Sequence, residues 1–166
     1  MLQRLYVHNF RCLVNFDLSL NGLSSALLVG RNGVGKSTIK SVLGVLQKIA
    51  RGQNRIKELV GVNDFAFGRL DLPMRFEIEV IIKQHLYRYG IALELPPGLR
   101  ELRVLEEKLS VDELVVYSRE KAQVVQTRGR DKIAEFSVDW HLIALPVIQE
   151  RSEEDPLHVF KHWLAR

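Results

Sequence analysis

The chain has 166 residues, of which 46% are hydrophobic and 27% are charged, and its formal net charge is +4. This length and composition fit one domain with a buried core and exclude a chain that is disordered throughout. The single cysteine, Cys12, excludes an intramolecular disulfide, and no apolar run approaches the roughly 20 residues that a membrane-spanning helix needs. We therefore expect a cytoplasmic protein.

The first predicted elements are strands. Residues 2–7 and 13–20 have strand patterns, and in the second Val14, Phe16, Leu18 and Leu20 alternate with polar residues, which predicts a half-buried strand. Asn21-Gly22 predicts a turn. The apolar run ALLV at residues 26–29 then predicts a buried strand, so the chain opens as a β-meander.

A phosphate-binding motif follows this run. Residues 30–37 read GRNGVGKS, a complete G-x-x-x-x-G-K-[ST] sequence, and the predicted order of strand, loop and helix is the one that the motif requires. Its glycines let backbone N–H groups approach phosphates, Lys36 adds a positive charge, and Ser37 offers a hydroxyl to magnesium. We therefore predict a nucleoside triphosphate with Mg²⁺ as the ligand.

The helical pattern after the motif spans residues 36–50. Its apolar residues at three- and four-residue spacing should pack on the sheet; they are Ile39, Val42, Leu43, Leu46, Ile49 and Ala50. Residues 55–60 predict one further helical turn.

Alternating strand patterns dominate the middle of the chain. Residues 74–82 and 87–95 alternate apolar and polar side chains and predict an antiparallel hairpin, and shorter strand patterns follow at 102–109, 114–118 and 123–127. The sequence RGRD at residues 128–131 predicts a polar turn. We interpret this region as an antiparallel β subdomain.

A helix closes the chain. Asp155 is the predicted N-cap, with Pro156 at the first helical position. Its predicted apolar face consists of Val159, Phe160, Trp163 and Leu164. We expect one domain over residues 1–166, with the meander, loop and helix at 1–60, the β subdomain at 61–135 and a C-terminal segment with a helix at 136–166.

The motif and its surroundings resemble a known family. The N-G-x-G-K-S-T core at residues 32–38 resembles ABC-type ATPases, and the opening LYVHNFR at residues 5–11, followed by a meander and LVGRNGVGKST, is similar to the RecF/SMC-like branch, including the predicted AAA-type ATPases of bacteria. The resemblance implies the N-terminal portion of a larger ATPase: an α/β P-loop NTPase lobe, ABC/SMC-head-like, with an antiparallel β subdomain. It also implies ATP as the nucleotide and a role in DNA repair, maintenance or defence.

The resemblance implies particular site residues. By position in the N-F-R sequence, Arg11 would reach towards the bound phosphates. Lys36 is the predicted catalytic residue and Ser37 the predicted magnesium ligand. The full set of predicted nucleotide-binding residues is Arg11, Gly30, Asn32, Gly33, Gly35, Lys36, Ser37 and Thr38.

Two motifs that the family needs for hydrolysis are missing. A Walker B motif would be an apolar strand that ends in Asp-Glu, and Asp17, Asp112 and Asp139 all lack that context. No signature sequence resembling L-S-G-G or L-S-x-G-Q is present either. In the family, two heads sandwich ATP, so we expect a homodimer or a partner that supplies both motifs, and we expect this chain to hydrolyse ATP poorly.

Several alternatives stay open. A noncatalytic nucleotide-sensing module and a kinase-like phosphotransferase both fit a phosphate loop, whereas no GTPase base-reading motif is present. DNA is a possible partner because residues 1–60 carry nine basic against two acidic side chains, a net charge of +7. The basic residues beyond the loop are Lys48, Arg51, Arg55 and Lys57.

Other side chains carry weaker signals. His158 and His162 have the i, i+4 spacing of a metal pair but no further ligand at the position a zincin needs, so a solvated helix flank is the favoured interpretation. Cys12 fits a buried cysteine better than a reactive one. The glutamine that contacts magnesium in ABC-type sites could be Gln84, Gln123, Gln126 or Gln149, and the sequence does not choose among them.

Overall fold

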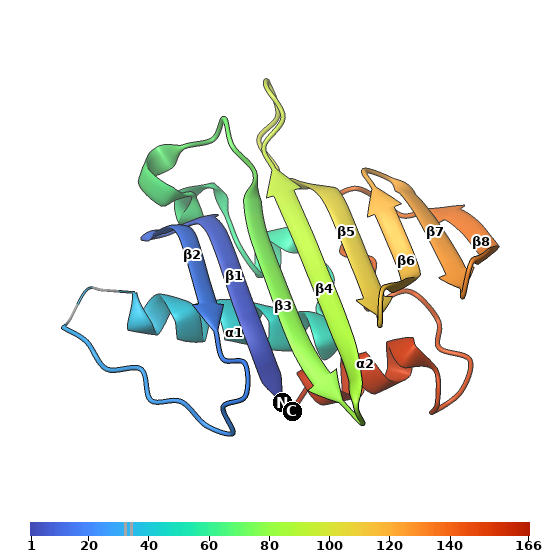
Figure 1. The fold of residues 1–166 in the computed structure, drawn as a ribbon. Helices are drawn as coiled ribbons and strands as arrows, with labels where there is room; N and C mark the ends of the chain where they lie inside the picture. Colours follow the sequence, from blue (N-terminus) through green and yellow to red (C-terminus); the bar gives the residue numbers. More distant parts are fainter. Residues whose placement is uncertain (32, 34) are drawn as a thin grey trace.

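The computed structural model describes residues 1–31, 33 and 35–166, and within them one antiparallel sheet carries both α-helices on the same face (Figure 1). Its strands follow the order β2-β1-β3-β4-β5-β6-β7-β8. They are β1 (Leu2–Phe10), β2 (Leu13–Ser19), β3 (Met74–Ile82), β4 (His85–Glu94), β5 (Arg103–Val111), β6 (Leu114–Glu120), β7 (Gln123–Arg128) and β8 (Asp131–Ser137).

The alternation of side chains gives the sheet two different faces. In β3, Met74, Phe76, Ile78 and Val80 are buried, whereas the residues between them are only partly buried and charged. The same alternation in β1 and β4 adds further apolar side chains to the helix-covered face. The opposite face is polar and open, as expected for an antiparallel sheet with one face in solvent.

The two helices supply the other half of the core. Helix α1 (Lys36–Ala50) buries Ile39, Val42, Leu46 and Ile49, and helix α2 (Pro156–Leu164) buries Leu157, Phe160 and Leu164. The carboxylate of Asp155 caps α2 by accepting a hydrogen bond from the backbone N–H of Leu157 at 2.9 Å. Three short 3₁₀-helices lie between α1 and β3: η1 (Ile56–Glu58), η2 (Val62–Asp64) and η3 (Ala66–Gly68).

Most of the predicted elements are confirmed. Both opening strands, the helix at residues 36–50, the turn at 55–60, the central hairpin, the three later strands, the turn before Asp131 and the final helix all appear. Strand β8 was not predicted. Neither α1 nor α2, within the residues that the structure describes, has the length and apolar content needed to cross a membrane.

The predicted fold class is wrong. The chain was expected to be an α/β P-loop NTPase lobe, ABC/SMC-head-like, with an antiparallel β subdomain, but the described residues form an antiparallel eight-stranded sheet with two α-helices. The strands assigned to a subdomain continue directly from β1, because β1 pairs with β3. The division of one domain at residues 60 and 135 stays a prediction.

The predicted buried strand at residues 26–29 is also wrong. These residues form no strand, and the side chains of Leu27 and Val29 are 86% and 83% exposed. Within the described sheet β2 is an edge strand that pairs with β1, and the third strand expected for the meander does not form on its outer edge. An apolar run alone therefore does not specify a buried strand.

Candidate functional site

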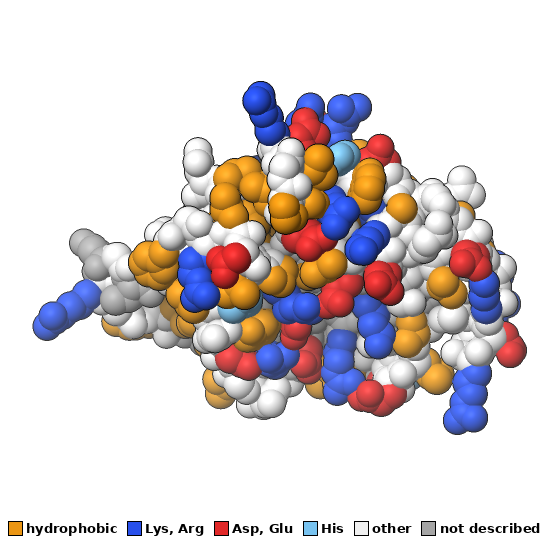
Figure 2. Space-filling model, turned by 90° about the horizontal axis from the view of Figure 1, so that it is seen from above, with side chains coloured by type: hydrophobic (Ala, Val, Ile, Leu, Met, Phe, Trp, Pro, Cys, Tyr) orange, Lys and Arg blue, Asp and Glu red, His pale blue; other side chains and the backbone are white. Residues whose placement is uncertain are grey.

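The predicted phosphate loop lies between β2 and the start of α1; of its described residues, Gly30, Arg31, Gly33 and Ser37 are exposed, whereas Gly35 is buried. Figure 2 shows this segment projecting from the side of the molecule. Two of its residues, Asn32 and Val34, lie outside the described part of the chain, so the predicted role of Asn32 stays a prediction.

Gly35 makes the entry into α1 possible. Its φ of 98° lies in the left-handed region, and a Cβ at this position would meet Leu13 Cδ2 at 3.0 Å and Cys12 Sγ at 3.4 Å. Gly33 also has a positive φ, 88°. Conformation and space both require glycine at position 35, which explains this position of the motif.

The Lys36 side chain folds back and bonds the backbone at the start of the loop. Its Nζ donates a hydrogen bond to the carbonyl oxygen of Arg31 at 2.7 Å and another to that of Gly30. These two carbonyls satisfy the ammonium group in this structure.

The first turn of α1 presents backbone N–H groups without a competing side chain. Gly35 is the N-cap, no side chain caps the helix, and the first turn contains no acidic residue. Thr38 is buried, and its Oγ1 lies 3.3 Å from Cys12 Sγ. The Thr38 hydroxyl therefore contacts the β1–β2 turn, where Cys12 is exposed rather than buried as predicted.

The β1–β2 turn brings Arg11 to the next turn of α1, which contains Ser41. The guanidinium donates from Nη1 to Ser41 Oγ at 3.0 Å and from Nε to Asp64 Oδ1 at 2.8 Å. Ser41 Oγ in turn donates to the backbone carbonyl of Ser37 at 3.0 Å. Arg11 thus lies two hydrogen bonds from Ser37, with an ion-pair partner, Asp64, that the sequence did not indicate.

The other two residues of the N-F-R sequence have structural roles. Asn9 is buried, and its Nδ2 donates to the carbonyls of Arg69 and Leu72 at 2.8 and 2.9 Å. The Phe10 ring packs edge-on against Phe76, with centroids 5.1 Å apart. Together they anchor the turn that carries Arg11.

The aspartates tested for a Walker B role are engaged elsewhere. The Arg4 guanidinium hydrogen-bonds Asp17 and lowers the pKa of its carboxyl, and the His85 imidazole and Leu86 N–H lower the pKa of Asp112. Asp139 Oδ1 accepts the backbone N–H of His141 at 2.8 Å. Each carboxylate therefore has a local structural partner.

The other candidate ligands do not gather at the loop. Gln123 and Gln126 lie in β7, near the opposite end of the sheet from β2, and Gln84 lies in the β3–β4 turn. The imidazoles of His158 and His162 stack 5.9 Å apart, and His158 Nδ1 lies 2.6 Å from the carboxylate of Glu150. Among the described residues no three His, Cys, Asp or Glu side chains form a metal cluster.

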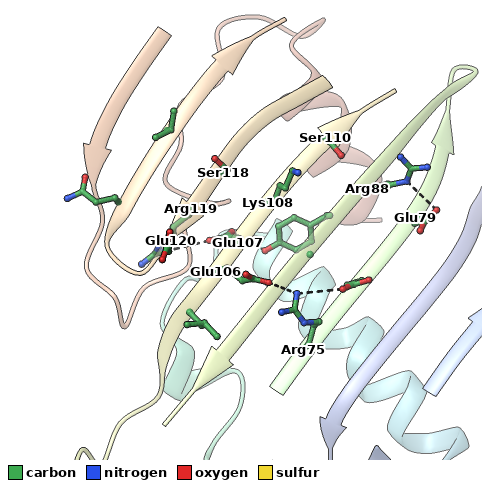
Figure 3. A pocket seen from close by; sticks show the side chains of 16 residues that line it. Arg75, Glu79, Arg88, Glu106, Glu107, Lys108, Ser110, Ser118, Arg119 and Glu120 are labelled. Carbon is green, nitrogen blue, oxygen red and sulfur yellow. Dashed lines mark hydrogen bonds and ion pairs between the residues drawn. The ribbon is translucent and has the colours of Figure 1, made fainter. Parts of the chain in front are cut away.

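The open face of the sheet contains a hollow of about 700 Å³ (Figure 3). Gly90 leaves its floor without a side chain, between Glu77 on β3 and Lys108 on β5. Its charges are largely paired across strands, as in Arg75–Glu106 at 2.5 Å and Arg88–Glu79 at 3.6 Å. This pairing leaves no positive field that would favour a triphosphate.

The basic residues beyond the loop, Lys48, Arg51, Arg55 and Lys57, are exposed. Arg51 Nε donates to the carbonyl of Ala165 at 2.8 Å, so part of its hydrogen-bonding capacity serves the C-terminus. Cations and carboxylates intermix over the surface seen in Figure 2.

Comparison of the chain with protein-family models and with curated proteins gave no match.

Proposed function

We propose that this chain binds ATP with Mg²⁺ at residues 30–38, as the Walker A portion of an ATPase similar in its motifs to the RecF/SMC-like branch. In this proposal the glycines and the N–H groups at the start of α1 hold the phosphates, and Lys36 neutralises their charge. Ser37 contributes a hydroxyl to magnesium. We propose the nucleotide site alone, since the α/β P-loop NTPase fold expected from the sequence is not the fold observed.

The observation that carries the proposal is the pair of hydrogen bonds from Lys36 Nζ to carbonyl oxygens of the loop. Its ammonium folds back on the carbonyls of Gly30 and Arg31 inside a complete motif, at a helix start without a side-chain cap. A cation held by two neutral acceptors beside free helix N–H groups is well suited to exchange them for phosphate oxygens. The exposed residues 26–29 leave the loop unsupported on its N-terminal side, and we therefore expect weak or moderate affinity.

Hydrolysis would need groups that the chain does not supply. The sequence contains no Walker B motif, and the carboxylates of Asp17, Asp112 and Asp139 accept hydrogen bonds from Arg4, the Leu86 N–H and the His141 N–H. We therefore infer a homodimer, or a partner that contributes the Walker B and signature elements across the nucleotide. A cytoplasmic location and a DNA partner, in repair, maintenance or defence, belong to the same proposal.

The alternative is a noncatalytic module that senses nucleotide without hydrolysing it. It needs the same site, and so binding alone does not separate the two. Phosphate release in the presence of the complementing partner would favour the ATPase. Binding without turnover in every assembly would favour the sensor.

Calorimetric titration with ATP and Mg²⁺ tests the site. We expect binding by the wild type and none by Lys36→Ala, because the substitution removes the ammonium group that would neutralise the phosphate charge. Lys40→Ala is the matched control, since Lys40 is an exposed lysine one turn further along α1. Equal binding by wild type and Lys36→Ala would refute the site, and steady-state hydrolysis by the isolated chain that Lys36→Ala abolishes would refute the incomplete enzyme.

A further inference from the structure

Asp64 and its neighbour Phe65 make four contacts that hold Asp64 beside the β1–β2 turn. Its Oδ2 accepts the N–H of Gly61 at 3.0 Å, and its backbone carbonyl accepts the N–H of Arg11 at 2.6 Å. The neighbouring residue, Phe65, forms a β-bridge with Phe10. The fourth contact is the ion pair of its Oδ1 with Arg11 Nε at 2.8 Å. These contacts hold the carboxylate in one orientation, and 23% of the side chain is exposed.

Arg11 is oriented by two acceptors. Asp64 Oδ1 accepts a hydrogen bond from Nε, and Ser41 Oγ, in the second turn of α1, accepts one from Nη1 at 3.0 Å. Within the described residues, Nη2 has no hydrogen-bond partner. Because the guanidinium is planar and its donors have a fixed geometry, fixing Nε and Nη1 also fixes where Nη2 points.

The path from Asp64 to the phosphate loop is continuous. It runs from the Asp64 carboxylate through the Arg11 guanidinium and Ser41 Oγ to the carbonyl of Ser37. Each step is a hydrogen bond of 3.0 Å or less. The β1–β2 turn that carries Arg11 also contacts the loop directly, through Cys12 and Thr38.

We propose that Asp64 is a positioning residue for nucleotide binding: it holds the Arg11 guanidinium against Ser41 in the second turn of α1, from which it can donate to phosphates bound at the helix start. This inference rests on the proposed ATP site. Asp64 itself touches no nucleotide; it lowers the entropic cost of placing a long, otherwise mobile cation. The backbone geometry supports this role. Arg11 has a positive φ of 52°, which is unfavourable for a residue other than glycine, so the contacts around the turn must stabilise it.

The test is a double-mutant cycle read by titration with ATP and Mg²⁺. Asp64→Asn keeps one acceptor for the Gly61 N–H but loses the charge that orients Arg11. We expect it to weaken ATP binding about threefold to fivefold, the range of a partly exposed ion pair. Arg11→Ala should weaken binding at least as much, and Asp64→Asn should add nothing in the Arg11→Ala background. Asp64→Glu should restore most of the affinity.

Glu94→Gln is the matched control, because Glu94 accepts from Arg103 Nε at 2.7 Å in a similar ion pair between β4 and β5. It should leave ATP binding unchanged, and none of these variants should greatly change the melting temperature without nucleotide. The positioning role is refuted if Asp64→Asn leaves the ATP affinity unchanged. It is also refuted if Asp64→Asn lowers the affinity by the same factor in the wild type and in the Arg11→Ala background. In both cases Lys36→Ala would still abolish binding, so the proposed site would stand. Loss of the proposed site itself would show as a wild type that does not bind ATP.

Discussion

The carboxylate of Glu107 and the guanidinium of Arg119 form an ion pair with both side chains fully buried, with Oε2 and Nη1 3.6 Å apart. Arg119 also donates to the backbone carbonyls of Leu142 and Asp139 at 2.6 and 2.9 Å. The hydrogen-bond donors to Glu107 are Tyr89 Oη, Tyr117 Oη, Ala144 N and Leu145 N. The pair therefore fastens the segment after β8 to the helix-covered face of the sheet.

Breaking this pair should be costly. Arg119→Met leaves the Glu107 charge buried without its counterion, and we expect a loss of about 3–5 kcal/mol in the free energy of unfolding. Glu107→Gln should cost a comparable amount, because an amide cannot accept all four donors. Urea unfolding measures both losses. Glu135→Gln, which breaks the exposed Lys132–Glu135 pair, should change stability by less than about 1 kcal/mol, and an equally small effect of Arg119→Met would contradict the account.

The two tyrosines beside Glu107 should ionise only when the protein unfolds. Burial, with the nearby Glu107 charge, raises the pKa of both Tyr89 and Tyr117 well above the usual value of 10.0. A raised folded-state pKa gives a contribution to stability that is complete below about pH 10 and is lost as the pH rises, because only the unfolded chain then releases these protons.

Phenolate absorbance and circular dichroism recorded over one alkaline titration should therefore share a cooperative step. That step should keep its midpoint in Tyr6→Phe, since Tyr6 lies on the open face of the sheet and bonds Asn15. Smooth ionisation of all four tyrosines of the chain before the loss of circular dichroism would contradict the burial of the pair.

Gly35→Ala should destabilise the start of α1. The left-handed backbone conformation costs a non-glycine residue about 1–3 kcal/mol, and the new Cβ must also displace Leu13. Gly44→Ala is the control on the same helix: a Cβ there meets nothing within 4 Å, so we expect a gain of about 0.5–1 kcal/mol. Thermal unfolding of the two variants should move in opposite directions, and a tolerated Gly35→Ala would argue against the described loop geometry.

Leu27→Ser should be nearly neutral. The side chain is 86% exposed, so we expect a change within about 0.5 kcal/mol, whereas Leu46→Ala, in the buried face of α1, should cost about 2–5 kcal/mol. Denaturant midpoints give both values. A large loss for Leu27→Ser would mean that residues 26–29 are buried in solution after all.

Local patterns predicted most of the elements, because the signals involved are local. The alternation from Met74 to Ile82 and the Asp155-Pro156 helix start depend only on neighbours in sequence, and both are confirmed. The fold class depended instead on which strand edge each segment meets. The motif context suggested a strand before Gly30, but residues 26–29 form none, and β1 pairs with β3, a long-range pairing that no sequence window contains.

The candidate site likewise combines residues that a local motif predicts with residues that only long-range contacts bring together. The glycine, lysine and serine positions follow from the spacing of one motif, and the structure gives Gly35 a steric reason. No sequence pattern indicated Asp64: it is the last residue of η2, beyond α1, and meets Arg11 only because the chain folds back, with Phe65 paired to Phe10. Glu107 and Arg119 likewise read as ordinary alternating strand charges, although they point into the core.

The position of β1 between β2 and β3 also has a consequence for how the chain folds. From β3 to β8, each strand pairs with its neighbour in sequence, and the connections are two-residue turns except for the loop at 95–102 between β4 and β5, so these hairpins close with little loss of chain entropy. The β1–β3 ladder must instead close the whole segment from Arg11 to Pro73, including α1. We therefore expect the β3–β8 hairpins to form early, and the β1–β2 hairpin, with the phosphate loop beside it, to join the sheet in a later and slower step.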